Sequence, residues 1–119
     1  MLCAGHALIA QSSVDILLIE QGGQDSSNVP RSLSVCPIQC RYYPSTAEIS
    51  LKFYVNMGHV DVTVTNMASL TEVTYQVSDM DGMMYFPVDY GPVELKVVEE
   101  SGRIYIGNFY AFYVFSLFL

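Results

Sequence analysis

Hydrophobic and polar residues alternate along most of this chain, and short turn signals separate the alternating runs. In residues 48–55, EISLKFYV, every second residue is apolar. Residues 59–66, HVDVTVTN, repeat the pattern beyond an Asn-Met-Gly turn. Period two on both sides of a glycine turn predicts an antiparallel hairpin with one solvated face. A slip of one residue would bury Lys52 and Asp61, so the register is well specified.

A second hairpin is predicted in residues 89–112, DYGPVELKVVEESGRIYIGNFYAF. Alternation along residues 91–98 stops at Glu-Glu-Ser-Gly and resumes from residue 103. The inward face of the returning strand stays open at this point. Either Ile104 and Ile106 face the core, or Tyr105, Gly107, Phe109 and Ala111 do, and a bulge near Gly107 would switch the phase midway.

Four further segments have the composition of strands, and a flexible loop, QGGQDSSNVP, follows the first of them. They are residues 14–20, 38–43, 72–79 and 83–88. Pro37 confines the start of the second segment to an edge or a bulge. Seven to eight short strands with turn signals every ~8–12 residues predict an all-β fold, an antiparallel β-sandwich of the immunoglobulin or fibronectin-III type.

The two ends of the chain differ from this pattern. Residues 1–11 are small and apolar and resemble the second half of a secretory signal, so we expect a truncated signal remnant there and a mature chain that begins near Gln11. The alternative is an ordinary first strand or a frayed terminus. Residues 12–112 form the predicted domain. Residues 113–119 are an apolar tail, too short to span a bilayer, which takes ~20 residues.

Composition narrows the function classes. Half of the residues are hydrophobic, which fits a folded domain, and the net charge is −7. Nucleic-acid binding depends on Lys and Arg meeting phosphates, so we predict no nucleic-acid partner. An anionic membrane surface is disfavoured for the same reason. The acids are scattered over turns and outward strand positions, which indicates solubility.

The cysteines and acids offer little chemistry. Cys36 and Cys40 lie about 13 Å apart if the strand is extended, too far for a disulfide, and they lack the ligands of a closed zinc site. A bend at Pro37 would shorten the gap, so a disulfide stays open as the less favoured alternative. Both are therefore predicted to be small, partly buried thiols. Asp79 and Asp81 in SDMDG lack the remaining ligands of a calcium loop and predict a turn. We predict no metal site and no cofactor.

No catalytic constellation is evident. His59 and Asp61 share the outward phase of one strand, but no nucleophile motif accompanies them. The domain also has little room for a cleft between paired carboxylates. The prediction is a protein that is not an enzyme.

Aromatic residues are the best functional candidates, because tyrosine is favoured where one end of a side chain is apolar and the other is wet. The chain has nine tyrosines and six phenylalanines. The predicted aromatic binding surface consists of Tyr42, Tyr43, Tyr54, Tyr85, Tyr90 and Tyr110.

Three local motifs together resemble a known family. They are PRSL (30–33), GHVDVTVTN (58–66) and YGPVELKVVEESGRIYIGNF (90–109). They resemble small secreted immunoglobulin-like β-sandwich proteins of gut anaerobic bacteria, a family described as a domain of unknown function. Residues that match the family's final hairpin are Gly91, Leu95, Val97, Gly102, Tyr105, Gly107 and Phe109, whereas Val93 replaces a usual aromatic. The resemblance implies a β-sandwich exported from the cell.

The final hairpin is also similar, more weakly, to C-terminal sorting domains of the type IX secretion route. Those domains usually end in a basic strand, and no Lys follows Arg103 here. The sequence thus predicts a secreted or periplasmic, non-catalytic module that binds a protein or a glycan at the cell envelope. The alternative is a sorting or anchoring domain.

Overall fold

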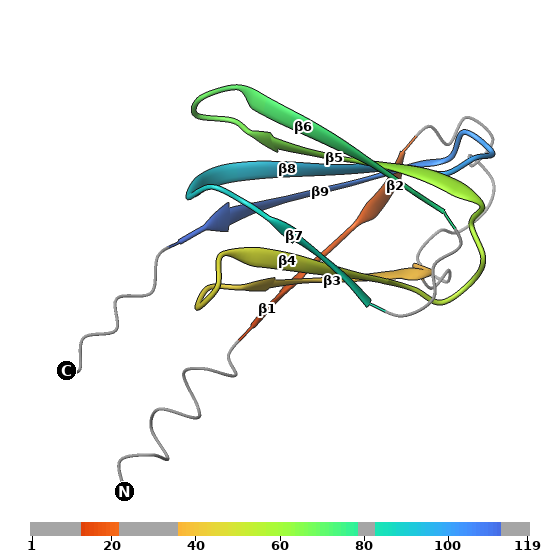
Figure 1. Cartoon of the computed structure of the whole chain (residues 1–119), viewed down its shortest axis with the longest axis horizontal. Helices are drawn as coiled ribbons and strands as arrows, with labels where there is room; N and C mark the ends of the chain where they lie inside the picture. Colours follow the sequence, from red (N-terminus) through yellow and green to blue (C-terminus); the bar gives the residue numbers. More distant parts are fainter. Residues whose placement is uncertain (1–12, 22–35, 79–82, 113–119) are drawn as a thin grey trace, which may run out of the picture.

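The computed structural model describes residues 13–21, 36–78 and 83–112, and there the chain forms two antiparallel sheets packed face to face (Figure 1). The four-stranded sheet has the order β1 (Val14–Ile16), β3 (Ile38–Tyr43), β4 (Glu48–Phe53), β7 (Met83–Pro87). The five-stranded sheet has the order β2 (Ile19–Gln21), β9 (Ile104–Ala111), β8 (Gly91–Val98), β5 (His59–Asn66), β6 (Thr71–Ser78). The predicted all-β sandwich is confirmed, with nine strands in these ranges instead of seven or eight.

The core lies between the inner faces of the two sheets. Alternate residues of β3, β5 and β8 are buried, as expected for strands with one solvated face. The largest fully buried side chains are Tyr42, Ile49, Leu51, Leu95, Val60, Val62, Val93 and Val97. Burying each aliphatic side chain of this size contributes roughly 1.5–3 kcal/mol, so these positions account for much of the stability.

The predicted hairpin between residues 48–55 and 59–66 is wrong. β4 pairs with β3 and β7, whereas β5 pairs with β6 and β8, so the intervening segment carries the chain from one sheet to the other. The Tyr54 N–H donates to the Pro37 carbonyl and holds the end of β4 in its own sheet. Alternation shows which face of a strand is buried and does not show which strand lies beside it.

The predicted first strand, residues 14–20, is divided between the sheets. β1 pairs with β3 in one sheet, and β2 pairs with β9 in the other. The change takes place at Leu17 and Leu18, of which Leu17 is exposed and Leu18 is buried. A continuous apolar run carries no phase signal, so the division could not be seen in the sequence.

The hairpin of β8 and β9 is present as predicted, and its inward face is settled. Tyr105, Gly107 and Ala111 are buried, whereas Ile104 and Ile106 are half-exposed. Pairing runs without interruption from Gly91 opposite Ala111 to Val98 opposite Ile104, so no bulge is needed.

Gly107 makes room for the segment that changes sheets. A Cβ at this position would lie 2.7 Å from Leu18 Cδ2 and 2.9 Å from the Leu17 carbonyl oxygen. Contacts this short would force the backbone of the N-terminal segment to move. The absence of a side chain at Gly107 therefore permits the crossing over β9.

The buried polar side chain of Asn66 links two loops, the β5–β6 turn and the segment before β8. Its Oδ1 accepts hydrogen bonds from the backbone N–H groups of Ala68 (3.0 Å) and Ser69 (3.1 Å). Its Nδ2 donates to the carbonyl of Tyr90 at 3.0 Å. The β5–β6 turn and the segment before β8 are thereby held together by one amide.

The predicted signal remnant and apolar tail lie outside the described residues, as does the turn at Asp79 and Asp81. Within the described ranges, no helix is long and apolar enough to cross a membrane.

We expect Asn66→Ala to lower the free energy of unfolding by about 1–3 kcal/mol, because it removes three hydrogen bonds between a buried side chain and partly buried backbone groups. Equilibrium denaturation with urea measures the change. Thr63→Ala, which removes one side of an exposed hydroxyl pair with Thr74, is the control and should cost less than about 0.5 kcal/mol. Equal losses in the two variants would contradict the role of Asn66.

Candidate functional site

Three of the six predicted tyrosines lie on the outer face of the four-stranded sheet. Tyr43 and Tyr85 belong to β3 and β7, and Tyr54 follows directly after β4. Tyr54 is 58% exposed and Tyr85 is 52% exposed. Because β3, β4 and β7 lie side by side (Figure 1), their outward residues form a single surface.

These side chains are linked by direct contacts. The rings of Tyr43 and Tyr85 have centroids 6.0 Å apart, and the Tyr85 hydroxyl lies 3.3 Å from the Met83 sulfur. Met83 pairs in register with Lys52, whose Nζ lies 5.2 Å from the centroid of the Tyr54 ring. We call Tyr43, Lys52, Tyr54, Met83 and Tyr85 the tyrosine surface.

Polar groups border the tyrosine surface. The Tyr54 hydroxyl donates to Gln39 Oε1 at 3.1 Å, and Arg41 forms an ion pair with Asp15 at 3.4 Å. Ser50 faces outward between Arg41 and Tyr85 in one row of the sheet, yet it is only 3% exposed. The long side chains around it therefore form a continuous layer over the sheet.

Tyr42 does not belong to this surface, and its prediction as a surface residue is wrong. It is fully buried, its hydroxyl donates to the Phe112 carbonyl at 2.9 Å, and its ring packs against those of Phe109 and Phe112. Successive residues of a strand point to opposite faces, so Tyr42 and Tyr43 could not both face outward. Burial raises the pKa of the Tyr42 hydroxyl.

Tyr90 and Tyr110 are exposed but lie elsewhere. Tyr110 belongs to β9 and faces outward from the five-stranded sheet, opposite Pro92. Tyr90 precedes β8, and its carbonyl accepts the amide of Asn66. The six predicted residues thus divide into one cluster of three, two separate exposed side chains and one core residue.

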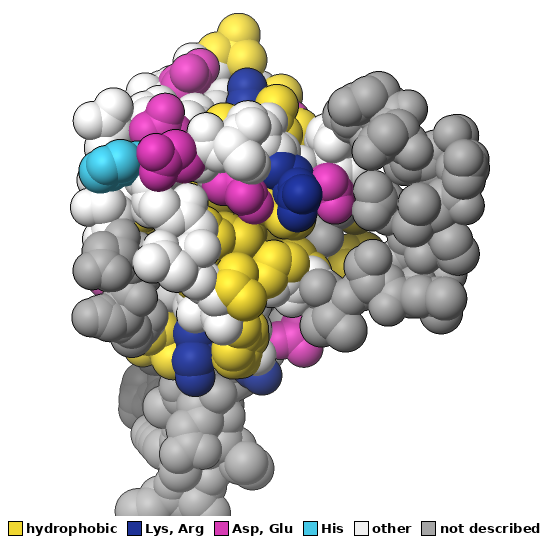
Figure 2. Space-filling view, turned by 90° about the vertical axis from the view of Figure 1, so that its right-hand side faces the viewer, with side chains coloured by type: hydrophobic (Ala, Val, Ile, Leu, Met, Phe, Trp, Pro, Cys, Tyr) yellow, Lys and Arg dark blue, Asp and Glu magenta, His cyan; other side chains and the backbone are white. Residues whose placement is uncertain are grey.

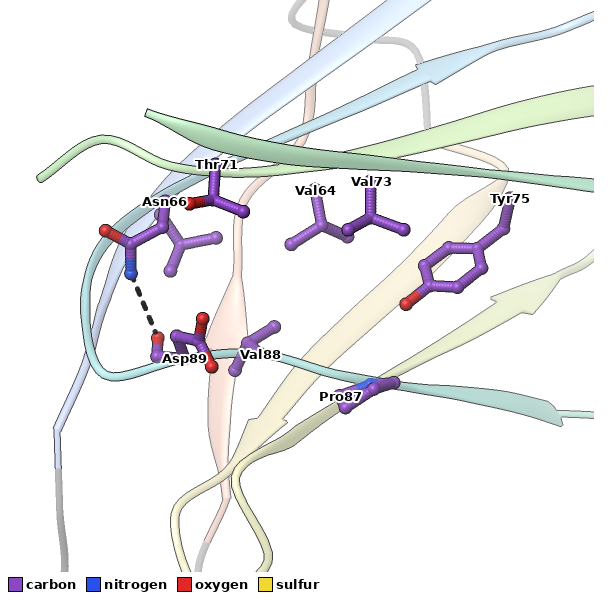
Figure 3. Close-up of a pocket in the computed structure, with 9 residues that line it drawn as sticks. Val64, Asn66, Thr71, Val73, Tyr75, Pro87, Val88 and Asp89 are labelled. Atoms are coloured by element: carbon purple, nitrogen blue, oxygen red, sulfur yellow. Dashed lines mark hydrogen bonds between the residues drawn. The ribbon is translucent and has the colours of Figure 1, made fainter. Parts of the chain in front are cut away.

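A groove of about 170 Å³ opens between the two sheets beside β6 (Figure 3). Its walls are mostly apolar: Val73 and Tyr75 come from β6, and Pro87 and Val88 lie across from them at the end of β7. Asn66 and Asp89 lie at one end, where Asn66 Nδ2 is 3.5 Å from the Asp89 carbonyl oxygen.

His59 lies at the start of β5 on the solvent side. Its backbone N–H donates to the carboxylate of Glu100 at 3.0 Å, which ties β5 to the turn between β8 and β9. In Figure 2, acidic side chains gather beside the histidine. His59, Asp61 and Ser78 border an open hollow, but no hydrogen bond from the His59 side chain to either is found among the described residues.

Cys36 and Cys40 are free thiols in the structure, as predicted. Burial raises the pKa of Cys36, and it raises the pKa of Cys40 from 9.0 to about 12. Within the described ranges, no group of three or more His, Cys, Asp or Glu side chains is placed to hold a metal ion.

Taken together, the two sheets and their outward tyrosines define an immunoglobulin-like β-sandwich with an aromatic outer surface. A scan against models of known protein families gives no match, and a search of curated proteins gives none. The chain is similar to the solved structure of a DUF3244 family protein with an immunoglobulin-like β-sandwich fold from Bacteroides vulgatus. The TM-score is 0.62 at 14% sequence identity, over 83% of this chain and 98% of that chain.

This similarity agrees with the family resemblance indicated by the sequence motifs, and it shows the fold. It assigns no activity, because proteins that share a sandwich have many unrelated functions.

Two members of the tyrosine surface were not predicted, although the sequence holds a signal for both. Met83 is two residues from Tyr85, and Lys52 is two residues from Tyr54, so each pair shares a face of its strand. The sequence does not indicate that β4 and β7 are neighbouring strands. This pairing places Lys52 and Tyr54 beside Met83 and Tyr85.

We expect the free energy of unfolding to fall above pH 9, because Cys40 keeps its proton in the folded state at a pH where the unfolded chain loses it. The stabilisation is complete below pH 9 and is lost as the pH rises toward 12, by about 1.4 kcal/mol per pH unit. Urea denaturation at pH 8 and pH 10.5 measures it. Cys40→Ala should show a shallower decline, and the same slope in both proteins would contradict this assignment.

Proposed function

We propose that this chain is a secreted, non-catalytic β-sandwich module that binds a glycan at the cell envelope through the tyrosine surface. The observation that carries the proposal is the connected row of aromatic and polar side chains from Tyr43 to Gln39 across β3, β4 and β7. Exposed apolar surface of this kind marks interaction sites in soluble proteins.

The chemistry of the surface fits a sugar ligand. Each pyranose ring has an apolar face of C–H groups, which stacks on an exposed aromatic ring, and a rim of hydroxyls, which needs hydrogen-bond partners. Tyr54 and Tyr85 supply exposed rings, and Lys52, Gln39 and the tyrosine hydroxyls supply donors and acceptors beside them.

A protein ligand is the alternative that the same surface allows. Tyrosine, methionine and arginine are enriched in protein interfaces, and all three are present here. The sheet face presents its side chains from regular strands, so little conformational entropy would be lost by ordering it on binding. The fold is compatible with both a glycan and a protein. Which of them binds depends on how its own polar and apolar groups match those of the tyrosine surface.

Secretion is supported by two features. The first residues of the chain resemble the end of a signal peptide, and the sequence motifs resemble those of a family of exported proteins. The function proposed requires export, because an envelope glycan is reached only from outside the cytosol.

We expect Tyr85→Ala to weaken binding of the cognate glycan at least about tenfold, which corresponds to ~1.4 kcal/mol and is typical of a central aromatic residue in an interface. A glycan array identifies the ligand, and titration calorimetry measures the affinity. Tyr110→Ala removes an even more exposed ring from the opposite sheet and should leave the affinity within about twofold. Binding that both variants retain would contradict the proposal, and binding only to proteins would establish the alternative.

We also expect the native protein to begin near Gln11 and to be recovered from the cell envelope or the medium. Intact-mass measurement on fractionated cells tests this directly. A cytosolic protein that keeps Met1 would contradict export and, with it, the envelope ligand.

A further inference from the structure

Within the described residues, one edge of the sandwich is long and carries no blocking feature. β6 has eight residues and pairs with β5 alone among the described strands. Its sequence, TEVTYQVS, contains no Lys and no Pro, and its pairing with β5 is continuous, with no bulge. Natural sheets use such devices to block edges, so among the described residues the β6 edge has the features of one that can accept a further strand.

The other edges of the two sheets differ from β6. β1 and β2 have three residues each, and β7 has five and ends in Pro87, which cannot donate to a neighbouring strand. Very short edges and edges with proline resist strand addition. Three of the four described edges thus carry a blocking feature, and β6 carries none among the residues that the structure describes.

The inner side of β6 is also incomplete. Val73 faces inward, yet it is 45% exposed, whereas Val62 and Val97 on the inner side of the same sheet are 0% exposed. The groove of Figure 3 runs along this side of β6, with Val73 and Tyr75 in its wall. A further strand beside β6 would cover Val73 and close the groove.

We propose that β6 of a second copy of this chain supplies that further strand. The two β6 strands then pair antiparallel across a twofold axis at Thr74. This inference goes beyond the proposed function. In this register, Val73 lies opposite Tyr75 of the second copy, on the inner side. Aromatic and β-branched residues are a favourable pair across antiparallel strands.

The outer side of the same register is equally self-complementary. Thr74 lies opposite Thr74 of the second copy, and its hydroxyl already shares a hydrogen bond with Thr63 at 2.9 Å. Glu72, the only charged residue of β6, lies opposite Gln76, so no like charges meet. Asp61 lies beside Gln76 on β5, so in this register a neutral side chain separates it from Glu72 of the second copy.

The symmetry has a consequence for binding. A twofold axis perpendicular to the five-stranded sheet produces one ten-stranded sheet and leaves both four-stranded sheets on the same side of it. Both tyrosine surfaces then face in one direction. If the proposed function holds, the dimer presents two sites to one glycan-covered surface and gains from multivalency.

The first experiment measures the mass of the full chain in solution by light scattering and sedimentation equilibrium, up to about 1 mM, where even weak edge contacts associate. We expect the mass to rise from that of one chain to that of two. Thr74→Glu places two carboxylates opposite each other at the axis and should remain a single chain. Thr63→Glu makes the same charge change one strand further in, beside Lys96, and should dimerise as the wild type does.

The second experiment tests the register itself. Thr74→Cys should form a covalent dimer under mild oxidation, because the two new thiols meet at the axis. Ser78→Cys, which is exposed on the same strand, should not, because the twofold axis places its two copies far apart. Both variants keep the native cysteines, so any crosslinking through those cysteines is the same in the two proteins.

A wild-type chain that stays single at every concentration would overturn the proposal. So would a dimer that Thr74→Glu leaves intact, or equal crosslinking of the two cysteine variants. Because the readouts are mass and crosslinking, none of these outcomes depends on whether a glycan binds.

Discussion

The arrangement of the sandwich depends on one short segment that belongs to both sheets. β1 extends the four-stranded sheet, and two residues later β2 extends the five-stranded sheet. The chain can cross at Leu17 and Leu18 only because Gly107 has no side chain beneath it. This crossing covers one lateral side of the core. On the opposite side, a groove between β6 and the end of β7 leaves Val73 of the inner face accessible among the described residues.

The two sheets consequently have different surfaces. The four-stranded sheet presents tyrosines, Met83 and Lys52 on its outer face, and its row of long side chains buries even an outward serine. The five-stranded sheet presents threonines and scattered charges on its outer face, and its free edge carries almost no charge. A ligand-binding face and a pairing edge can therefore coexist without competing for the same residues.

The sequence predicted those features that depend on alternation within one strand. The class of fold and the inward valines of β5 follow from a period of two, which each strand carries by itself. The β8–β9 hairpin was predicted from the short Glu-Glu-Ser-Gly turn between two such strands. The pairing of β4 with β7 and the division of residues 14–20 depend on contacts between distant parts of the chain, which a local pattern does not encode. For the same reason, Tyr54 and Tyr85 were each predicted to be exposed, but the sequence did not show that they belong to one surface.

The segment that belongs to both sheets also sets an order of events during synthesis. β2 is the second of the described strands to be made, yet its partner β9 is the last of them. Until Ile106 has emerged, Ile19 has no strand to pair with, whatever its local preference. The sandwich can therefore be completed only when all of the described strands have been made, because β2 is held in its sheet by β9.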